Sequence, residues 1–258
     1  MTRQNTPTQS ATHRLHQALR IDAPPDWPAA RAAILAGAPV DTAIQVRAGA
    51  TPLIVAATLD GCTAEVGWLL DHGAAIDARD NQGETALVRA VQHRRTADIA
   101  LLLQRGADPN VRDLKGWPVL VLACWTIGAG SAKDIIATFI GHGADPNARA
   151  RDGRTVLMAA PLMTDVKSAK DLIVTLLDHG ADPAATTPDG RTAPEIFMTN
   201  GHPKPTGCLD EVLASDHRAA ARRRLLDKLT DAQCAQWLPK STVAEATMEA
   251  RKAWRRTP

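Results

Sequence analysis

Two series of glycines recur along the chain and divide it into segments of similar length. The first series precedes apolar runs and comprises Gly49, Gly83, Gly116, Gly153 and Gly190. The second series follows apolar runs, stands before an alanine, and comprises Gly37, Gly73, Gly106, Gly143 and Gly180. Successive members of the first series are 34, 33, 37 and 37 residues apart. Repeats of this length shelter one another's apolar faces, so the pattern favours a stacked array over a single closed core.

The best-preserved copy of the repeat runs from Asp80 to Asp113. Its start, Gly83-Glu-Thr-Ala-Leu87, matches Gly49-Ala-Thr-Pro-Leu53 one copy earlier, and its end, Leu102 to Asn110, contains Gly-Ala-Asp-Pro-Asn. In these residues the chain resembles the ankyrin-repeat family. The resemblance implies an all-α fold, a solenoid of stacked helix pairs with short β-turn or hairpin tips.

The repeats and their flanks predict the domain organisation. We expect a polar N-terminal tail over residues 1–10, a degenerate capping repeat over 11–43, ankyrin-like repeats over 44–214, and a helical extension over 215–258. The repeats divide at about 44–79, 80–112, 113–149, 150–186 and 187–214. The extension is basic, with ten Lys or Arg against five Asp or Glu, and it either folds onto the last repeat or moves freely.

Several residues have the chemistry of helix starts. Asp26 and Thr51 each provide a side-chain oxygen for the free amides of a following helix, and Pro52 suits the first helical position because it lacks an N–H. In the fourth copy Pro118-Val119 replaces Thr-Pro, so we expect the local cap to be lost there. In ankyrin repeats a His typically follows Thr-Pro-Leu and ties the turn to the helix. That position is Ile54, Val88, Val121, Met158 or Glu195 here, so apolar packing must replace the hydrogen bonds.

The fourth and fifth copies each contain about four extra residues between the Leu that starts the first helix and the Gly-Ala pair that closes the second. These residues either lengthen the joint between the paired helices or add a turn to one helix. Both insertions end in nearly the same five-residue sequence, Ser131-Ala-Lys-Asp-Ile135 and Ser168-Ala-Lys-Asp-Leu172. We expect each Ser to cap the second helix of its copy.

The sequence contains little that indicates catalysis, a cofactor or a metal. His72, His142 and His179 recur at one repeat position. His142 and His179 stand one layer apart, which is too far for ligands that must meet about 2 Å from one zinc ion. Common phosphate-binding, hydrolase and metalloprotease motifs are absent. The four cysteines lie far apart and are expected to be reduced packing residues. With a polar start and no long apolar run, we expect a cytoplasmic, monomeric protein that is not an enzyme.

The resemblance also implies where a partner would bind. Ankyrin-like stacks generally bind through the turn tips and the exposed face of the first helix, which line a concave surface. Carried over position by position, the tips are Asn81, Gln82, Glu84, Leu114, Lys115, Trp117, Arg151, Asp152 and Arg154. The helix positions are Gln92, His93, Trp125, Thr126, Leu162 and Met163.

Two of the six Trp residues fall on this surface in one repeat. Trp is strongly enriched where interfaces are most tightly held. We therefore expect Trp117 and Trp125 to bind a protein partner, with a rim formed by Arg149, Arg151 and Arg154. The alternative is that Trp125 folds under the enlarged loop and fills its own core.

These observations predict a non-enzymatic scaffold that binds another protein. One alternative is an inhibitor or immunity-like protein that masks a single target. Another is a nucleic-acid or anionic-membrane binder acting through the basic C-terminal helices, where Arg222, Arg223 and Arg224 stand together. A solvated helix face also explains this run of arginines.

Overall fold

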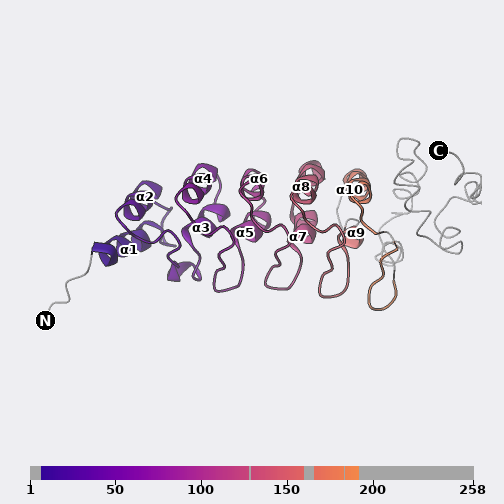
Figure 1. The fold of residues 1–258 in the computed structure, drawn as a ribbon, viewed down its shortest axis with the longest axis horizontal. Helices are drawn as coiled ribbons and strands as arrows, with labels where there is room; N and C mark the ends of the chain where they lie inside the picture. The colour runs from indigo at the N-terminus through magenta and orange to yellow at the C-terminus, as the bar shows by residue number, and fades with distance from the viewer. Residues whose placement is uncertain (1–6, 128, 160–165, 183, 192–258) are drawn as a thin grey trace, which may run out of the picture. The chain divides into compact units, whose positions relative to one another are not determined.

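The computed structural model describes residues 7–127, 129–159, 166–182 and 184–191. The chain forms two compact units, residues 1–127 with 137–145 and residues 128–136 with 146–258, which are described separately. Over the described residues the regular structure is helical and no strand forms, which confirms the all-α prediction (Figure 1). Isolated antiparallel bridges, such as Ile44 with Ala50 and Arg112 with Pro118, close the turns.

The helices are short and come in pairs. In the first unit they are α1 (Pro7–Ala18), α2 (Trp27–Leu35), η1 (Gln45–Arg47), α3 (Pro52–Thr58), α4 (Thr63–Asp71), α5 (Ala86–Gln92), α6 (Thr96–Gln104) and α7 (Val119–Thr126). Helix α8 (Ala129–Gly141) has residues in both units, and α9 (Val156–Ala159) and α10 (Val166–Asp178) belong to the second.

Helices of the first unit pack within pairs and between successive pairs. Helix α3 packs against α4 and α5, α5 packs against α6 and α7, and α4 packs against α6. Figure 1 shows the pairs α3–α4 and α5–α6 side by side, with the turn loops all on one side of the unit. This is the arrangement of a repeat array, in which stability comes from interfaces between successive units.

The expected helix starts are present. Asp26 Oδ1 accepts a hydrogen bond from the Ala29 amide at 3.0 Å, and Thr51 Oγ1 accepts one from the Ile54 amide at 3.4 Å, with Pro52 at the first position of α3. Helix α7 begins after Pro118 without a side-chain cap, as predicted. The start of α7 therefore depends on packing rather than on a local hydrogen bond.

The extra residues of the fourth and fifth copies lengthen the second helices. Helices α8 and α10 each have 13 residues, whereas α4 and α6 have nine. Of the two alternatives, an added turn is therefore observed. The prediction that Ser131 and Ser168 cap these helices was wrong, because each helix begins two residues earlier and places the Ser within its first turn.

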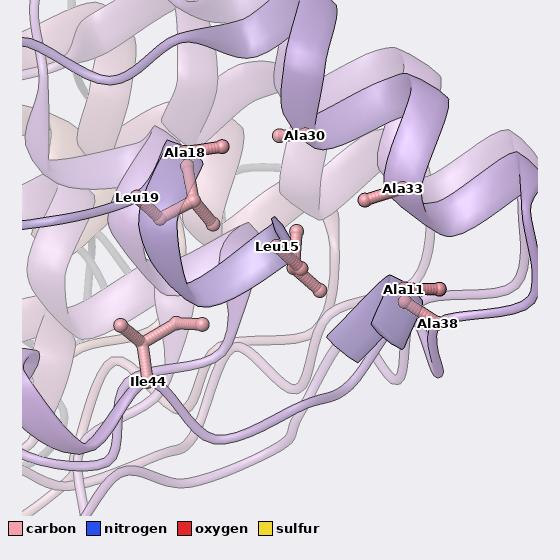
Figure 2. Close-up of a cluster of buried hydrophobic side chains, with 8 residues drawn as sticks. All are labelled: Ala11, Leu15, Ala18, Leu19, Ala30, Ala33, Ala38 and Ile44. Carbon is pink, nitrogen blue, oxygen red and sulfur yellow. The ribbon is translucent and has the colours of Figure 1, made fainter. Parts of the chain in front are cut away.

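The first repeat closes the array with a core of small apolar residues. Figure 2 shows Leu15 of α1 among Ala30 and Ala33 of α2, with Leu19 and Ile44 nearby. Trp27 and Ile34 pack against this cluster and are partly buried. Because alanine side chains are short, the two helices approach closely and still exclude water.

Apolar residues occupy the position where the family places a His. Ile54, Val88, Val121 and Met158 are all 0–1% exposed. The prediction that packing replaces the missing hydrogen bonds is confirmed for these four residues. Each such side chain contributes on the order of 1.5–3 kcal/mol by being removed from water.

A series of side-chain oxygens joins each repeat of the first unit to the next. Asp41 Oδ1 accepts a hydrogen bond from the Ala75 amide at 3.0 Å, and Asp77 Oδ1 accepts one from the Asp108 amide at 3.1 Å. These acceptors stand four residues after the glycines that close second helices. We call these contacts, with those of Asn110 and Asn147 below, the inter-repeat ladder.

Asparagine continues the ladder and adds a second bond. Asn110 Oδ1 accepts from the Asp145 amide at 2.9 Å, while Asn110 Nδ2 donates to the Gly143 carbonyl at 3.1 Å. Within the second unit Asn147 does the same, accepting from the Asp182 amide at 2.6 Å and donating to the Gly180 carbonyl at 3.1 Å. An asparagine therefore fixes both a donor and an acceptor of the following turn.

Successive turns also approach each other closely at Gly49. The Asn81 amide donates to the Ala48 carbonyl at 3.0 Å, and a Cβ added to Gly49 would lie 2.3 Å from Asn81 Oδ1. Gly83 has a similar left-handed backbone, with φ of +76° against +70° at Gly49, but has open space where its Cβ would lie. Comparing substitutions at the two glycines therefore distinguishes the cost of a strained backbone from the cost of disturbing the contact between repeats.

We predict that Gly49→Ala destabilises the protein more than Gly83→Ala. Both substitutions place a Cβ in a left-handed conformation at a cost of roughly 1–2 kcal/mol, and only the first also displaces Asn81. Urea unfolding of both variants measures the difference. In an Asn81→Ala background the extra cost at Gly49 should disappear, and equal costs for the two substitutions in the wild-type background would contradict the close approach.

Candidate protein-binding surface

Two tryptophans on the fourth copy contact each other. The rings of Trp117, in the turn, and Trp125, near the end of α7, have centroids 4.4 Å apart and an interplanar angle of 66°, an edge-to-face arrangement. Both side chains are half-buried. The Trp125 Nε1 atom is buried and makes no hydrogen bond to the described residues. We call these two residues the Trp pair.

The turn before the Trp pair is held by one aspartate. Asp113 Oδ1 accepts from the Trp117 amide at 2.7 Å, and the Asp113 amide donates to the Trp117 carbonyl at 3.0 Å. Between them Leu114 is 63% exposed and Lys115 is exposed. The turn therefore presents an apolar side chain and a cation to solvent beside the Trp pair.

One copy earlier, the same face is occupied by a buried ion-pair network. Arg89 Nη2 lies 2.6 Å from Asp80 Oδ2, and Arg89 Nε lies 3.0 Å from Glu84 Oε2. Gln92 Nε2 donates to Glu84 Oε1 at 2.9 Å, and Gln82 Oε1 accepts from Arg89 at 2.7 Å. We call these five residues the Arg89 network.

Glu84 was expected to be an exposed tip residue, and the structure places it differently. Glu84 is only 4% exposed, because Arg89 and Gln92 of α5 both contact its carboxylate. The Leu114 amide of the next turn also lies 3.5 Å from Glu84 Oε1. Glu84 therefore supports the surface from beneath.

The Arg89 network and the Trp pair use equivalent positions. Trp117 and Trp125 stand 33 residues after Glu84 and Gln92, the same interval that separates Gly116 from Gly83. In one copy the two positions meet through a hydrogen bond of 2.9 Å, and in the next through two indole rings. The backbone thus brings this turn position and this helix position together whatever side chains they carry.

The remaining predicted positions of the first unit lie at the surface. Asn81 and His93 are exposed, and Thr126 is half-buried with its hydroxyl donating to the Leu122 carbonyl at 2.8 Å. Partial desolvation lowers the pKa of His93, and the charges of Arg95 and Arg89 lower it further. His93 is thereby disposed to be neutral near pH 7.

The predicted arginine rim belongs to the second unit. Arg149 Nη1 donates to the Gly153 carbonyl at 3.0 Å and to the Thr186 carbonyl at 2.6 Å, so it braces two turns. Arg154 Nε lies 3.3 Å from Asp152 Oδ2. Arg151 and Asp152 are exposed, and Arg154 is partly exposed. Leu162, Met163, Arg222, Arg223 and Arg224 lie outside the described residues.

Each of the recurring histidines is hydrogen-bonded to the helix that it follows. In each case Nδ1 bonds the carbonyl four residues earlier, at 2.8 Å for His72, 2.9 Å for His142 and 2.7 Å for His179. Over the described part of the chain, no group of three or more His, Cys, Asp or Glu side chains is placed to hold a metal ion. No described helix is long and apolar enough to cross a bilayer.

The comparison with known families agrees with this architecture. Residues 25–113 match the family model for ankyrin repeats in three copies. Residues 25–113 of this chain therefore form ankyrin repeats. The matched residues extend from before α2 to Asp113 and end just ahead of the Trp pair. No curated protein matches the chain.

Ankyrin repeats generally mediate interactions between proteins, and the family is typically a non-enzymatic interaction module. Sequence reasoning missed two features that position the turns. One is the inter-repeat ladder. The other is an arginine four residues before a turn glycine, seen as Arg79 to Gly83 at 2.6 Å and Arg112 to Gly116 at 2.8 Å. Both features could have been predicted, because the ladder residues and the arginines each recur at a fixed distance from the repeat glycines.

One buried carboxylate lies outside the candidate surface. Asp98, in the first turn of α6, is 2% exposed, and its Oδ1 makes no hydrogen bond within the described residues. Burial raises the pKa of Asp98 above its ordinary value of 3.8, against the lowering effects of a Thr63 hydrogen bond and the Arg95 charge. Nearby Asp60 raises it further. The charged form of Asp98 is therefore disfavoured in the folded protein.

We predict that Asp98→Asn stabilises the protein at neutral pH. Because the folded pKa is raised, the stability that the protonated carboxyl contributes is present below 3.8 and is lost as pH rises through the folded value. The asparagine side chain does not ionise, so the variant does not lose stability in this way as pH rises. Urea unfolding across acidic to neutral pH should show its advantage growing with pH, and a less stable variant at pH 7 would show that the charged carboxylate is compensated.

Proposed function

We propose that the chain is a non-enzymatic scaffold that binds a partner protein through the turns and first helices of its repeats. The observation that carries this proposal is the Trp pair, two half-buried indoles in edge contact at 4.4 Å, next to Leu114, which is 63% exposed. Large apolar side chains left at the surface beside aromatic rings mark interaction sites in soluble proteins.

The arrangement suits tight binding because it is formed in advance. Each indole restricts the other, and Trp117 is further fixed by the hydrogen bond of its amide to Asp113. A partner that covers these rings has few side chains to immobilise on this side, which lowers the cost of association. Trp side chains at the centre of an interface often contribute about 2 kcal/mol or more.

Other predicted residues fit roles around this centre. In the first unit we propose Asn81, Gln82, Gln92, His93, Lys115 and Thr126 as contact residues, with Glu84 in support of them. In the second unit we propose Arg151, Asp152 and Arg154, while Arg149 holds the turns that present them. A scaffold and an inhibitor that masks one target would use the same surface, so the bound partner's activity distinguishes them.

We predict that Leu114→Ser and Trp117→Ala reduce capture of a partner by the immobilised chain from an extract of its source cells in high salt. For Trp117→Ala, a loss of about 2 kcal/mol corresponds to roughly thirtyfold weaker binding. Quantitative mass spectrometry of the retained proteins provides the measurement. Binding through the basic C-terminal residues would instead be lost in high salt.

The matched control is Leu35→Ser. Leu35 ends α2 and is 69% exposed, close to the 63% of Leu114, and it lies outside the predicted surface. The control should retain the same proteins as the wild type, and circular dichroism should show all variants folded. Undiminished capture by both Leu114→Ser and Trp117→Ala would exclude the proposed surface.

A further inference from the structure

One residue of the connection between α5 and α6 has a strained backbone. Arg94 has φ of +58°, in the left-handed region that side chains other than glycine rarely adopt. The connection between α3 and α4 has Gly61 at the equivalent position, since each residue stands two before the first residue of the following helix. Gly61 has φ of +72°, with open space where its Cβ would lie. Glycine thus makes this connection in one copy, and arginine makes it in the next at a cost in stability.

No contact among the described residues offsets this cost. Arg94 is exposed, and its side chain makes no hydrogen bond or ion pair with any residue that the structure describes. The adjacent Arg95 differs, because it is half-buried and its Nη1 atom lies 2.8 Å from Asp60 Oδ1 of the preceding connection. The exposed acid nearest in the repeat pattern is therefore already paired, and the guanidinium of Arg94 is available to another molecule.

Arg94 also lies at the edge of the proposed binding surface, directly after His93. Partial desolvation lowers the pKa of His93. The positive charges of Arg95 and Arg89 lower it further, and each has a larger effect than the opposing charge of Glu84. Positive charge therefore outweighs negative charge at the end of α5, which favours an anionic group of a partner there.

Resting on the function proposed above, we propose that Arg94 is a further contact residue of the binding surface and that it binds a carboxylate of the partner protein. A guanidinium donates two parallel hydrogen bonds to a carboxylate, and such charge-assisted bonds are stronger than neutral ones. Strained backbone concentrates at binding sites, where the function of the side chain offsets its cost. The inference therefore predicts that glycine at this position improves folding and impairs binding.

The folding half of this prediction is tested by urea unfolding of three variants. Arg94→Gly should raise the folding equilibrium constant roughly fivefold, because glycine adopts the left-handed backbone without strain. Ala48→Gly is the matched control and should have a similar effect, because Ala48 is also exposed and has φ of +54°. Arg94→Ala keeps a Cβ and should be about as stable as the wild type. If Arg94→Gly is no more stable than the wild type, the strain is absent and the inference fails.

The binding half is tested with a random peptide library displayed on phage and selected on the full chain. Enriched peptides with a fluorescent label are then compared on the variants by anisotropy. We expect peptides that share an Asp or Glu and bind roughly tenfold more weakly to both Arg94→Gly and Arg94→Ala. Arg14→Ala should bind them as the wild type does, because Arg14 is an exposed arginine of α1 outside the proposed surface and also has no partner among the described residues.

A double-mutant cycle identifies the group that Arg94 binds. Replacing the shared acid of a peptide by alanine should weaken binding to the wild type roughly tenfold and should have little further effect on binding to Arg94→Ala. Independent, additive effects of the two substitutions would overturn the assignment of the carboxylate to Arg94.

The other outcomes separate this inference from the proposed function. Peptides that bind Arg94→Ala as well as the wild type but lose affinity for Trp117→Ala overturn the inference and leave the binding surface standing. Peptides that bind both variants as well as the wild type, or a selection that enriches none, overturn both. If an oligouridine or phosphatidylglycerol vesicles bind through Arg94 in place of acidic peptides, the inference of a protein carboxylate is overturned.

Discussion

The structure depends on side-chain oxygens that reach from one repeat to the backbone amide of the next. Asp41, Asp77 and Asn110 each accept such an amide within the first unit, at 2.9–3.1 Å. A hydrogen bond of this kind contributes about 0.5–1.5 kcal/mol to stability. The ladder satisfies these amides and at the same time sets the register of successive turns, which the buried helix faces alone would fix less sharply.

With the register set, one turn position and one helix position outside the apolar core carry different side chains in successive copies. The positions of Glu84 and Gln92 carry a hydrogen-bonded acid and amide in one copy, and the equivalent positions carry Trp117 and Trp125 in the next. Buried positions show the opposite behaviour, since Ile54, Val88 and Val121 remain β-branched and fully covered. The apolar core positions are therefore more uniform from copy to copy than the turn and helix positions beside them.

The sequence predicted the parts of the fold that depend on local chemistry. The helix pairs, the caps at Asp26 and Thr51, and the missing cap at Pro118 each follow from the residues at the site. The starts of α8 and α10 did not, because a serine can stand within the first turn of a helix as well as at its cap, as Ser131 and Ser168 do.

The candidate site was predictable only in part for a related reason. Exposure of Leu114 and Lys115 follows from their place in a turn. Burial of Glu84 depends on Arg89 and Gln92 folding back from the helix, and the contact between Trp117 and Trp125 depends on two ring orientations. Long side chains choose among several such partners, and the repeat pattern does not encode the choice.

The most direct test of the ladder is hydrogen exchange at the Asp145 amide, which Asn110 Oδ1 accepts at 2.9 Å. Asn110→Ala removes the acceptor, and Asn110→Asp keeps it, as Asp77 does one copy earlier. The account predicts Asp145 exchange at least about tenfold faster in Asn110→Ala, from a lost bond of about 1.4 kcal/mol. Exchange should be unchanged in Asn110→Asp and at Asp182, which Asn147 holds. Equal exchange at Asp145 in the wild type and Asn110→Ala would contradict it.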